Sequence, residues 1–362
     1  MLRVLIVEDS LSVQRTLTAL LEDVVGIEIV GIADNGRQAV NMCNDLMPDL
    51  VTMDIFMPEM DGLEATRIIM RECPTRIVVI SAMVGPGDVH SLFEAMRAGA
   101  IEVIEKPRGV LTGNYSEVKQ NLVRVLKQAM VAEPEAQLSW RPSDPAINPT
   151  FSSESTLPPS SISSVENIID PMTFVPQIIC IGGSTGAPTV IMEVLSALEA
   201  DYPFPIIVAQ HIARGFSRGL SDWLNTAVNI PVSLAQNGET PQQGNVYIIP
   251  DDAHLNFTPD KKIQLEAASN FKVHVPSIDR LFFSTAQVYP NAAVGIILSG
   301  MGSDGAAGLL EMRRCGALTA AQNEETSVVY GMANVAVENG AVMKSYSPSG
   351  LVRLLKRMDR GN

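Results

Sequence analysis

The sequence has little cysteine, few histidines and no long apolar run. Its four cysteines, at 43, 73, 180 and 315, form no C-x-x-C pair. Neither a zinc site nor a disulfide framework is therefore predicted, and buried free thiols in a reducing compartment are the simpler interpretation. No apolar stretch approaches the roughly 18 residues of a membrane-spanning helix. The N-terminus, MLRVLIVEDS, carries an acidic pair where a signal peptide would stay apolar. We expect a soluble, cytoplasmic protein that does not insert into membranes.

Positive charge is also scarce. The chain has 26 Lys and Arg against 40 Asp and Glu, a net charge of -14 at pH 7. Binding to nucleic acid depends on clustered basic side chains, so no nucleic-acid partner is expected. The apolar fraction of 46% is enough for sizeable cores, and 362 residues suggest two domains of ordinary size.

The clearest boundary between domains lies in residues 131–175. This stretch holds seven Pro, nine Ser and only one basic residue, Arg141. It cannot bury enough apolar surface to fold alone, which is typical of a linker. On both sides, short apolar runs alternate with helical patterns, which predicts parallel sheets built from βαβ units. We expect an α/β protein with two doubly wound parallel-sheet domains, at 1–125 and 176–362, joined by a linker at 126–175.

Polar side chains follow the predicted strands of the first half. The strands are continuously apolar, as expected where helices cover both faces of a sheet; they are Val4–Val7, Glu28–Ile32, Leu50–Met53, Ile77–Ile80 and Glu102–Ile104. The carboxyl ends of parallel strands meet in one crevice. The residues that follow these ends are Glu8, Asp9, Asp54, Ser81 and Lys106.

Three carboxylates in one crevice repel one another, and a divalent cation removes that cost. Oxygen ligands with few protein groups favour Mg²⁺. A carboxylate beside the metal can attack a phosphoryl group, while Lys106 and the Ser81 hydroxyl hold the phosphoryl oxygens. Each of these residues alone is more often a helix cap or a loop residue. The complete set favours a phosphate pocket.

A nucleophile motif opens the second half. Gly182, Ser184 and Gly186 match G-x-S-x-G between a predicted strand, Gln177–Ile181, and a predicted helix, Thr189–Leu198. Such a turn exposes the hydroxyl at a helix N-terminus, where backbone N–H groups favour a developing oxyanion. For the motif alone, a phosphate loop or an ordinary tight turn stays an alternative.

Two further predicted strands carry partners for this serine. Pro205–Gln210 is followed by His211, and Val294–Ser299 is followed by a glycine-rich loop containing Asp304. If the three strands are neighbours, Ser184, His211 and Asp304 share one crevice. The imidazole would take the serine proton and the carboxylate would orient the ring.

The loop GMGSDG at 300–305 also matches the dinucleotide fingerprint G-x-G-x-x-G. Asp304 would lie where the pyrophosphate approaches and would repel it. The unit also comes late in its domain, whereas the fingerprint usually occupies the first βα turn. We interpret this match as accidental.

The first half resembles the response-regulator receiver family over about residues 1–125. The motifs are VEDS at 7–10, DIFMPEMDGLEA at 54–65, Ser81-Ala82 and Lys106-Pro107. The resemblance implies a flavodoxin-like fold and phosphorylation of Asp54 by a histidine kinase of the CheA type. It also implies Mg²⁺ bound by Asp9, Asp54 and the Phe56 carbonyl, with Glu8 acting through water.

The second half resembles chemotaxis protein-glutamate methylesterases, the CheB family, over about residues 176–358. The motifs are GGSTGAP (182–188), AQHIARGFSRGLSDWLN (209–225), GNVYIIPDDAHL (244–255), PSIDRLFFS (276–284), LSGMGSDGAAGL (298–309) and EETSVVYGMANVAV (324–337). The resemblance implies a Rossmann-like domain with Ser184 as nucleophile, His211 as base and Asp304 as orienting carboxylate. Thr185 and Met301 would line the site, with the Met301 N–H as an oxyanion donor.

The same resemblance implies the biological role. The substrates would be methyl-accepting chemotaxis receptors, whose glutamate methyl esters are hydrolysed and whose glutamines are deamidated, with no cofactor in the esterase step. The resting receiver would cover the esterase crevice until Asp54 is phosphorylated. Two alternatives stay open: a phospho-regulated binding module with an inactive hydrolase domain, and an esterase for small molecules.

Overall fold

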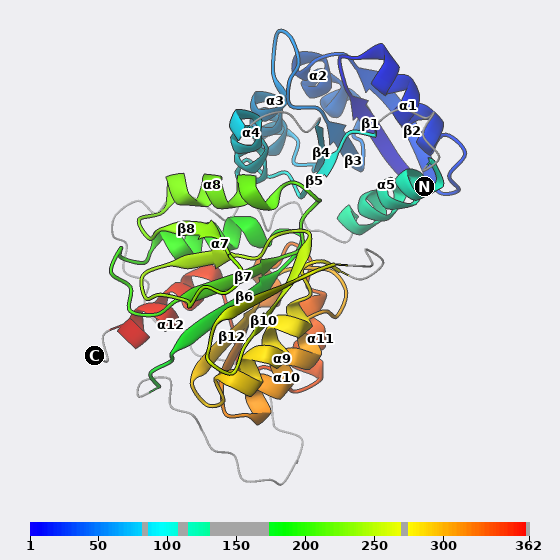
Figure 1. Ribbon diagram of the computed structural model, residues 1–362. Coiled ribbons are helices and arrows are strands. Elements are labelled where there is room, and N and C mark those ends of the chain that lie inside the picture. The colour runs from blue at the N-terminus through cyan, green and yellow to red at the C-terminus, as the bar shows by residue number, and fades with distance from the viewer. Residues whose placement is uncertain (82–85, 108–114, 131–173, 269–273, 360–362) are drawn as a thin grey trace, which may run out of the picture.

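The chain folds into two α/β halves, which lie one above the other in Figure 1. The computed structural model describes residues 1–81, 86–107, 115–130, 174–268 and 274–359. Most of the predicted linker, residues 131–173, lies outside the described residues. The predicted boundary at 125 falls within helix α5 (Tyr115–Ala129), and the domain limits stay a prediction.

The first half is a five-stranded parallel sheet with helices on both faces. The strand order is β2-β1-β3-β4-β5. The strands are β1 (Leu2–Val7), β2 (Ile27–Ala33), β3 (Leu50–Met53), β4 (Arg76–Ser81) and β5 (Glu102–Glu105). The helices are α1 (Leu11–Leu21), α2 (Gly36–Leu46), α3 (Gly62–Glu72), α4 (Pro86–Arg97) and α5. This order is the flavodoxin-like arrangement.

The second half is built on a seven-stranded parallel sheet. Its order is β14-β13-β12-β6-β7-β9-β8. The strands are β6 (Ile178–Gly183), β7 (Ile206–Gln210), β8 (Val232–Leu234), β9 (Val246–Ile248), β12 (Ala293–Ile297), β13 (Leu318–Gln322) and β14 (Lys344–Tyr346). The predicted fold class, two doubly wound parallel-sheet domains, is confirmed.

The helices of the second half cover its sheet, and a small hairpin lies beside it. The helices are α7 (Ala187–Ser196), α8 (Ser217–Ala227), α9 (Ile278–Val288), α10 (Ala306–Arg314), η1 (Glu324–Thr326), α11 (Met332–Glu338) and α12 (Pro348–Asp359). The hairpin pairs β10 (Ala253–Phe257) with β11 (Ile263–Ala267) in antiparallel fashion. None of the helices in the described ranges has the length and apolar character needed to cross a membrane.

Local sequence explains where several helices begin. The Asn35 side chain accepts a hydrogen bond from the Gln38 amide at 2.9 Å, at the start of α2. The Asp61 side chain caps α3 in the same way, through the Glu64 amide at 2.7 Å. Such caps satisfy backbone donors that have no partner within the helix. They fix the turns that lead away from the carboxyl ends of the strands.

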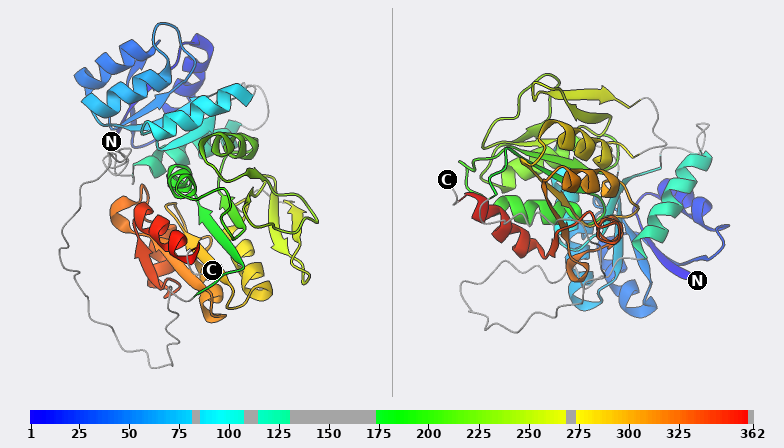
Figure 2. Two further views of the ribbon diagram at one scale, coloured as in Figure 1. Left: turned by 90° about the vertical axis from the view of Figure 1, so that its left-hand side faces the viewer. Right: turned by 90° about the horizontal axis from the view of Figure 1, so that it is seen from below.

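The two halves meet through α4 and α5 of the first and α7 and α8 of the second. Helix α4 packs against α8, and the two lie side by side in Figures 1 and 2. The Phe93 ring stacks on the Trp223 ring with centroids 5.0 Å apart, and Trp223 Nε1 donates to Glu94 Oε1 at 3.3 Å. Val328 and Val329 of the second half join a buried cluster with residues of α5. The contact around α4 and α8 therefore combines a stacked aromatic pair with the hydrogen bond between Trp223 and Glu94.

Candidate active site and acidic pocket

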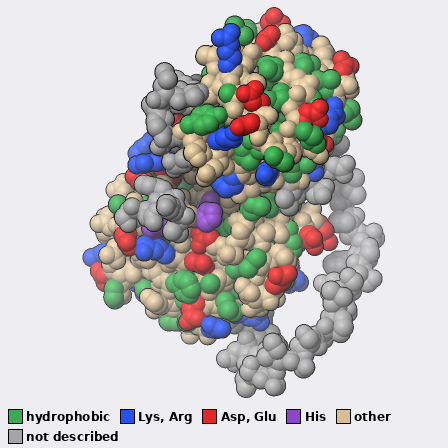
Figure 3. Space-filling model, turned by 90° about the vertical axis from the view of Figure 1, so that its right-hand side faces the viewer, with side chains coloured by type: hydrophobic (Ala, Val, Ile, Leu, Met, Phe, Trp, Pro, Cys, Tyr) green, Lys and Arg blue, Asp and Glu red, His purple; other side chains and the backbone are tan. Residues whose placement is uncertain are grey.

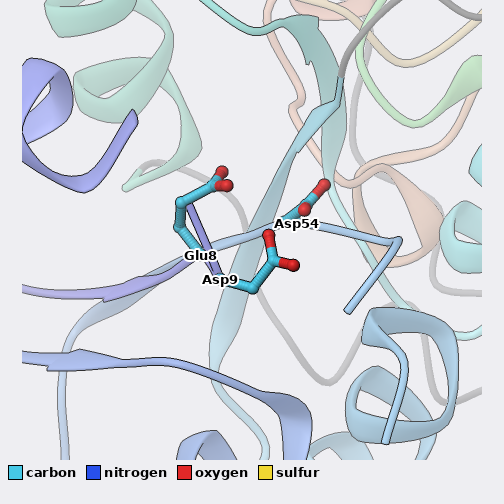
Figure 4. Close-up of side chains that lie close together, drawn as sticks. All are labelled: Glu8, Asp9 and Asp54. Carbon is cyan, nitrogen blue, oxygen red and sulfur yellow. The ribbon is translucent and has the colours of Figure 1, made fainter. Parts of the chain in front are cut away.

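Three carboxylates gather at the carboxyl edge of the first sheet. Glu8 and Asp9 follow β1, Asp54 follows β3, and all three offer ligand atoms within 4.8 Å of one another. Figure 4 shows the three side chains converging. Glu8 and Asp54 are buried, whereas Asp9 is exposed. The predicted convergence of strand ends is therefore present in the structure.

Lys106 joins this acidic pocket from the end of β5. Its Nζ lies 2.8 Å from Asp54 Oδ2 and 2.9 Å from Glu8 Oε2. Burial raises the pKa of Glu8 and Asp54 above the usual values, although hydrogen bonds from Lys106 oppose the shift. Burial alone would lower the pKa of Lys106, but its bonds to Asp54 and Glu8 outweigh that effect and raise it.

The pocket is suited to a divalent cation. Three carboxylates face one ammonium among the described residues, which leaves an excess of negative charge in a buried place. A hard cation with oxygen ligands would balance it. Ser81, fully buried at the end of β4, accepts the Lys106 amide through its carbonyl at 2.8 Å. Phe56 follows Asp54 by two residues, and its side chain is exposed.

In the second half, β12, β6 and β7 are neighbours, so their carboxyl ends form one edge. The Ser184 amide donates to the Ser299 carbonyl at 3.0 Å, and the His211 amide donates to the Gly183 carbonyl at 2.9 Å. The buried Gln210 side chain donates to the carbonyls of both Ser184 and His211, at 2.8 and 2.9 Å. These bonds fix the backbone around the serine and the histidine relative to each other.

Two glycines allow the sharp turn that carries Ser184. Gly186 precedes α7 with φ of 79°, a left-handed conformation that residues with a Cβ rarely adopt. A Cβ on Gly300 would lie 2.6 Å from the Ser184 Cβ. The loop after β12 can therefore approach the serine closely only because residue 300 has no side chain.

His211 and Asp304 form a hydrogen-bonded pair. His211 Nε2 lies 2.9 Å from Asp304 Oδ2, and the two side chains are 9% and 12% exposed. Asp304 also accepts the backbone amides of Ile278 and Asp279 at the start of α9, at 2.8 and 3.0 Å. The Ser277 hydroxyl donates to the same carboxylate at 3.2 Å. The carboxylate is thus fixed by donors from a separate helix and oriented toward the imidazole.

The electrostatic surroundings keep Asp304 charged. Burial would raise the pKa of Asp304, but the hydrogen bonds from His211 and the backbone amides outweigh it and lower the pKa. Since Nε2 is engaged by the carboxylate, Nδ1 is the ring nitrogen left for proton transfer. Nδ1 is buried and has no hydrogen-bond partner among the described residues. Nδ1 is therefore the ring nitrogen that can accept a proton from a group in the adjoining cavity.

Ser184 and His211 line one cavity of about 870 Å³, together with Thr185 and Met301. The Ser184 hydroxyl makes no hydrogen bond with His211 within the described ranges. The opposite wall of the cavity comes from the first half, including Glu102 of β5 and Arg124 of α5. Figure 3 shows histidine side chains in the hollow between the halves. Four of the five residues named for this site therefore line this cavity, and the fifth, Asp304, bonds to His211 from behind it.

Sequence reasoning missed two polar residues at this junction. The Thr185 hydroxyl donates to Glu102 Oε2 at 2.6 Å. The exposed His274 ring stacks on the His211 ring, with centroids 4.5 Å apart and planes 9° from parallel. Glu102 begins a strand in the other half, and His274 precedes α9. Neither position carries a local motif that could have revealed its place.

Comparison with known proteins identifies the lineage of both halves. The family model for the response regulator receiver domain matches residues 4–111, and the model for CheB methylesterase matches residues 179–355. A protein-glutamate methylesterase/protein-glutamine glutaminase from Syntrophus aciditrophicus is 38% identical over 99% of this chain and 98% of its own length. This chain belongs to the CheB methylesterase family.

Other members align along their whole length as well. A protein-glutamate methylesterase/protein-glutamine glutaminase from Geobacter metallireducens is 37% identical over 98% of each chain. The catalytic domain of the Thermotoga maritima CheB methylesterase is 31% identical and covers 49% of this chain and 98% of its own, with a TM-score of 0.47. The CheB methylesterase match spans Ser184, His211 and Asp304, and the receiver match spans the acidic pocket.

Proposed function

We propose that the protein is a phosphorylation-activated protein-glutamate methylesterase. It hydrolyses glutamate methyl esters on methyl-accepting chemotaxis receptors to glutamate and methanol, and it deamidates receptor glutamines. One observation carries the proposal: Ser184 and His211 line one cavity, Asp304 engages one ring nitrogen of His211, and the other nitrogen has no hydrogen-bond partner among the described residues. The full-length similarity to proteins named for both activities supports it.

The proposed mechanism is of the serine type. Ser184 Oγ turns toward His211 Nδ1, gives up its proton and attacks the γ-carbonyl of the substrate side chain. Asp304, held as a carboxylate, stabilises the imidazolium that forms. The ring then returns the proton to departing methanol, or to ammonia when the substrate is a glutamine. Water hydrolyses the glutamyl-enzyme by the same steps in reverse order.

Backbone amides near the serine stabilise the oxyanion. Ser184 precedes the N-terminus of α7, where the helix dipole favours negative charge. Met301 lines the same cavity, and we assign its N–H as an oxyanion donor. Removing one such donor typically costs about 10²–10³-fold in kcat. Nucleophile, base and orienting charge all come from side chains, so we assign no cofactor to the esterase step.

The acidic pocket supplies regulation. Asp54 is the proposed phosphoryl acceptor and a CheA-type histidine kinase the proposed donor. Mg²⁺ held by Asp9, Asp54, the Phe56 carbonyl and, through water, Glu8 would supply positive charge for the phosphoryl oxygens. Lys106 and Ser81 would hold those oxygens on the protein side. A phosphoryl group adds a charge of about -2, and we propose that it releases the receiver half from the esterase cavity.

Methanol release from a methylated receptor fragment tests the proposal. Ser184→Ala should lower the rate by about 10⁶-fold, as loss of the nucleophile does in serine hydrolases. Ser196→Ala, on the helix that follows, is the matched control and should leave the rate unchanged. Demethylation by Ser184→Ala at the wild-type rate would reject the serine mechanism.

Two comparisons test regulation and substrate class. A phosphoryl donor should raise the wild-type rate but not that of Asp54→Ala; activation of the variant would reject Asp54 as the switch. Free glutamate γ-methyl ester hydrolysed as efficiently as the methylated receptor would favour an esterase for small molecules.

A further inference from the structure

A glutamate of the receiver half lies beside the candidate nucleophile of the other half. Glu102, at the start of β5, accepts the Thr185 hydroxyl at 2.6 Å through Oε2. Thr185 directly follows Ser184. Glu102 lines the same cavity as Ser184 and His211. The receiver therefore contributes a carboxylate to the esterase cavity, as well as the apolar surface that covers it.

This carboxylate is costly to place. The Glu102 side chain is half-buried. Burial raises its pKa, although the hydrogen bonds from Thr185 and from the Val103 amide and the positive charge of Arg124 oppose the shift. Removing a carboxylate from water is unfavourable. Apolar side chains would stabilise a contact between the halves without this cost, as the pairing of Phe93 with Trp223 does. Holding the two halves together therefore does not explain why a glutamate occupies position 102.

The chemistry of the proposed reaction offers an explanation for Glu102. Its product is a glutamate side chain, with a γ-carboxylate on two methylene groups, formed at Ser184. Glu102 presents the same group one residue away from that serine. We infer that Glu102 is an internal product mimic that fills the subsite for the substrate γ-carboxyl group. The Thr185 hydroxyl is then the donor that recognises that group. This inference rests on the proposed esterase function.

A mimic on the same chain competes with the substrate. While the halves are together, substrate binds only when Glu102 has left the subsite. The unphosphorylated enzyme then shows a raised KM at an unchanged kcat, because a saturating substrate displaces the mimic. Phosphorylation that withdraws the receiver lowers the KM by removing the competitor.

The test is a substrate titration with the full chain in the absence of a phosphoryl donor. Glu102→Ala should lower the KM roughly 10-fold at constant kcat, the typical scale for one charge-assisted hydrogen bond. Glu102→Gln keeps the length of the side chain and checks that any change is not a folding defect. An unchanged KM in both variants would overturn the inference.

A small probe separates occupancy of the subsite from simple covering of the cavity. N-acetyl-isoglutamine carries a free γ-carboxylate and should inhibit Glu102→Ala about ten times more strongly than wild type. Glu94→Ala is the matched control, since Glu94 also bonds across the junction, to Trp223, but does not line the cavity. Equal sensitivity of Glu94→Ala and Glu102→Ala to the probe would mean that Glu102 only helps to cover the site.

Thr185→Val in the Glu102→Ala background tests the recognising donor. The probe should bind about ten times more weakly when the hydroxyl is absent; equal inhibition would overturn the assignment of Thr185. Failure of the proposed esterase function can be distinguished from failure of the inference about Glu102. Phosphorylated wild type that releases no methanol would end both ideas, whereas active wild type with an unaltered Glu102→Ala variant would end only this one.

Discussion

Phe93→Ala should open the junction between the halves. Phe93 and Trp223 are 2% and 1% exposed, and their rings stack with planes 19° apart. Truncating a buried Phe costs about 3–5 kcal/mol in total, but part of that falls on the receiver core to which Phe93 also belongs. The aromatic pair alone contributes about 0.5–1.5 kcal/mol. The closed arrangement should therefore weaken by about 10-fold.

Two measurements check this prediction without a phosphoryl donor. Methanol release at low substrate should rise about 10-fold. Emission from Trp223 should shift to the red as the ring becomes exposed, measured in a Trp140→Phe background so that one tryptophan remains. Phe283→Ala, at a Phe that is already 40% exposed, is the control. A folded Phe93→Ala protein with wild-type rate and emission would refute the claim that this stack holds the halves together.

Three further substitutions address the second half. Asp304→Asn should lower kcat by about 10⁴-fold, as in other serine triads. The native pKa of Asp304 lies below its usual value of 3.8. The wild type should therefore be more stable than this variant above pH 3.8, and this difference should disappear as the pH falls through the native pKa. Urea unfolding at pH 7 and pH 3 measures the difference, and an equal difference at both pH values would contradict the reasoning. Gly300→Ala places a Cβ 2.6 Å from that of Ser184, so steady-state assays should show kcat reduced about 10²-fold, and a wild-type kcat would contradict the close approach. Asp279→Ala removes the acceptor of the Gly308 amide at 2.7 Å and should cost about 1 kcal/mol of unfolding free energy, a loss that thermal denaturation would detect or exclude.

The parallel strands could be predicted because burial on both faces leaves a continuous apolar run. Leu50–Met53 was placed at its observed limits. The helix predicted at Thr189–Leu198 begins two residues earlier, at Ala187, because Pro188 is tolerated in a first helical turn. The hairpin of β10 and β11 was not predicted. β10 lacks clear alternation, with buried side chains at four of its five positions.

Some residues of the candidate site could be predicted from the sequence and others could not. Ser184, His211 and Asp304 could be proposed from sequence because each follows a strand of one parallel sheet, and the carboxyl ends of such strands share an edge. Glu102 and His274 could not. Docking of two domains leaves no periodic pattern in the sequence, so the residues that one half contributes to the other have no signature of their own.

The short strand β5 has a mechanical consequence. Its first residue, Glu102, bonds to Thr185 in the esterase cavity, and the residue after its last, Lys106, bonds to Asp54 in the acidic pocket. At about 3.3 Å per residue, the four steps between them span about 13 Å. An extended backbone segment hardly stretches, so β5 links the two pockets as a stiff backbone connection. A displacement of Lys106 should therefore be transmitted along the strand to Glu102.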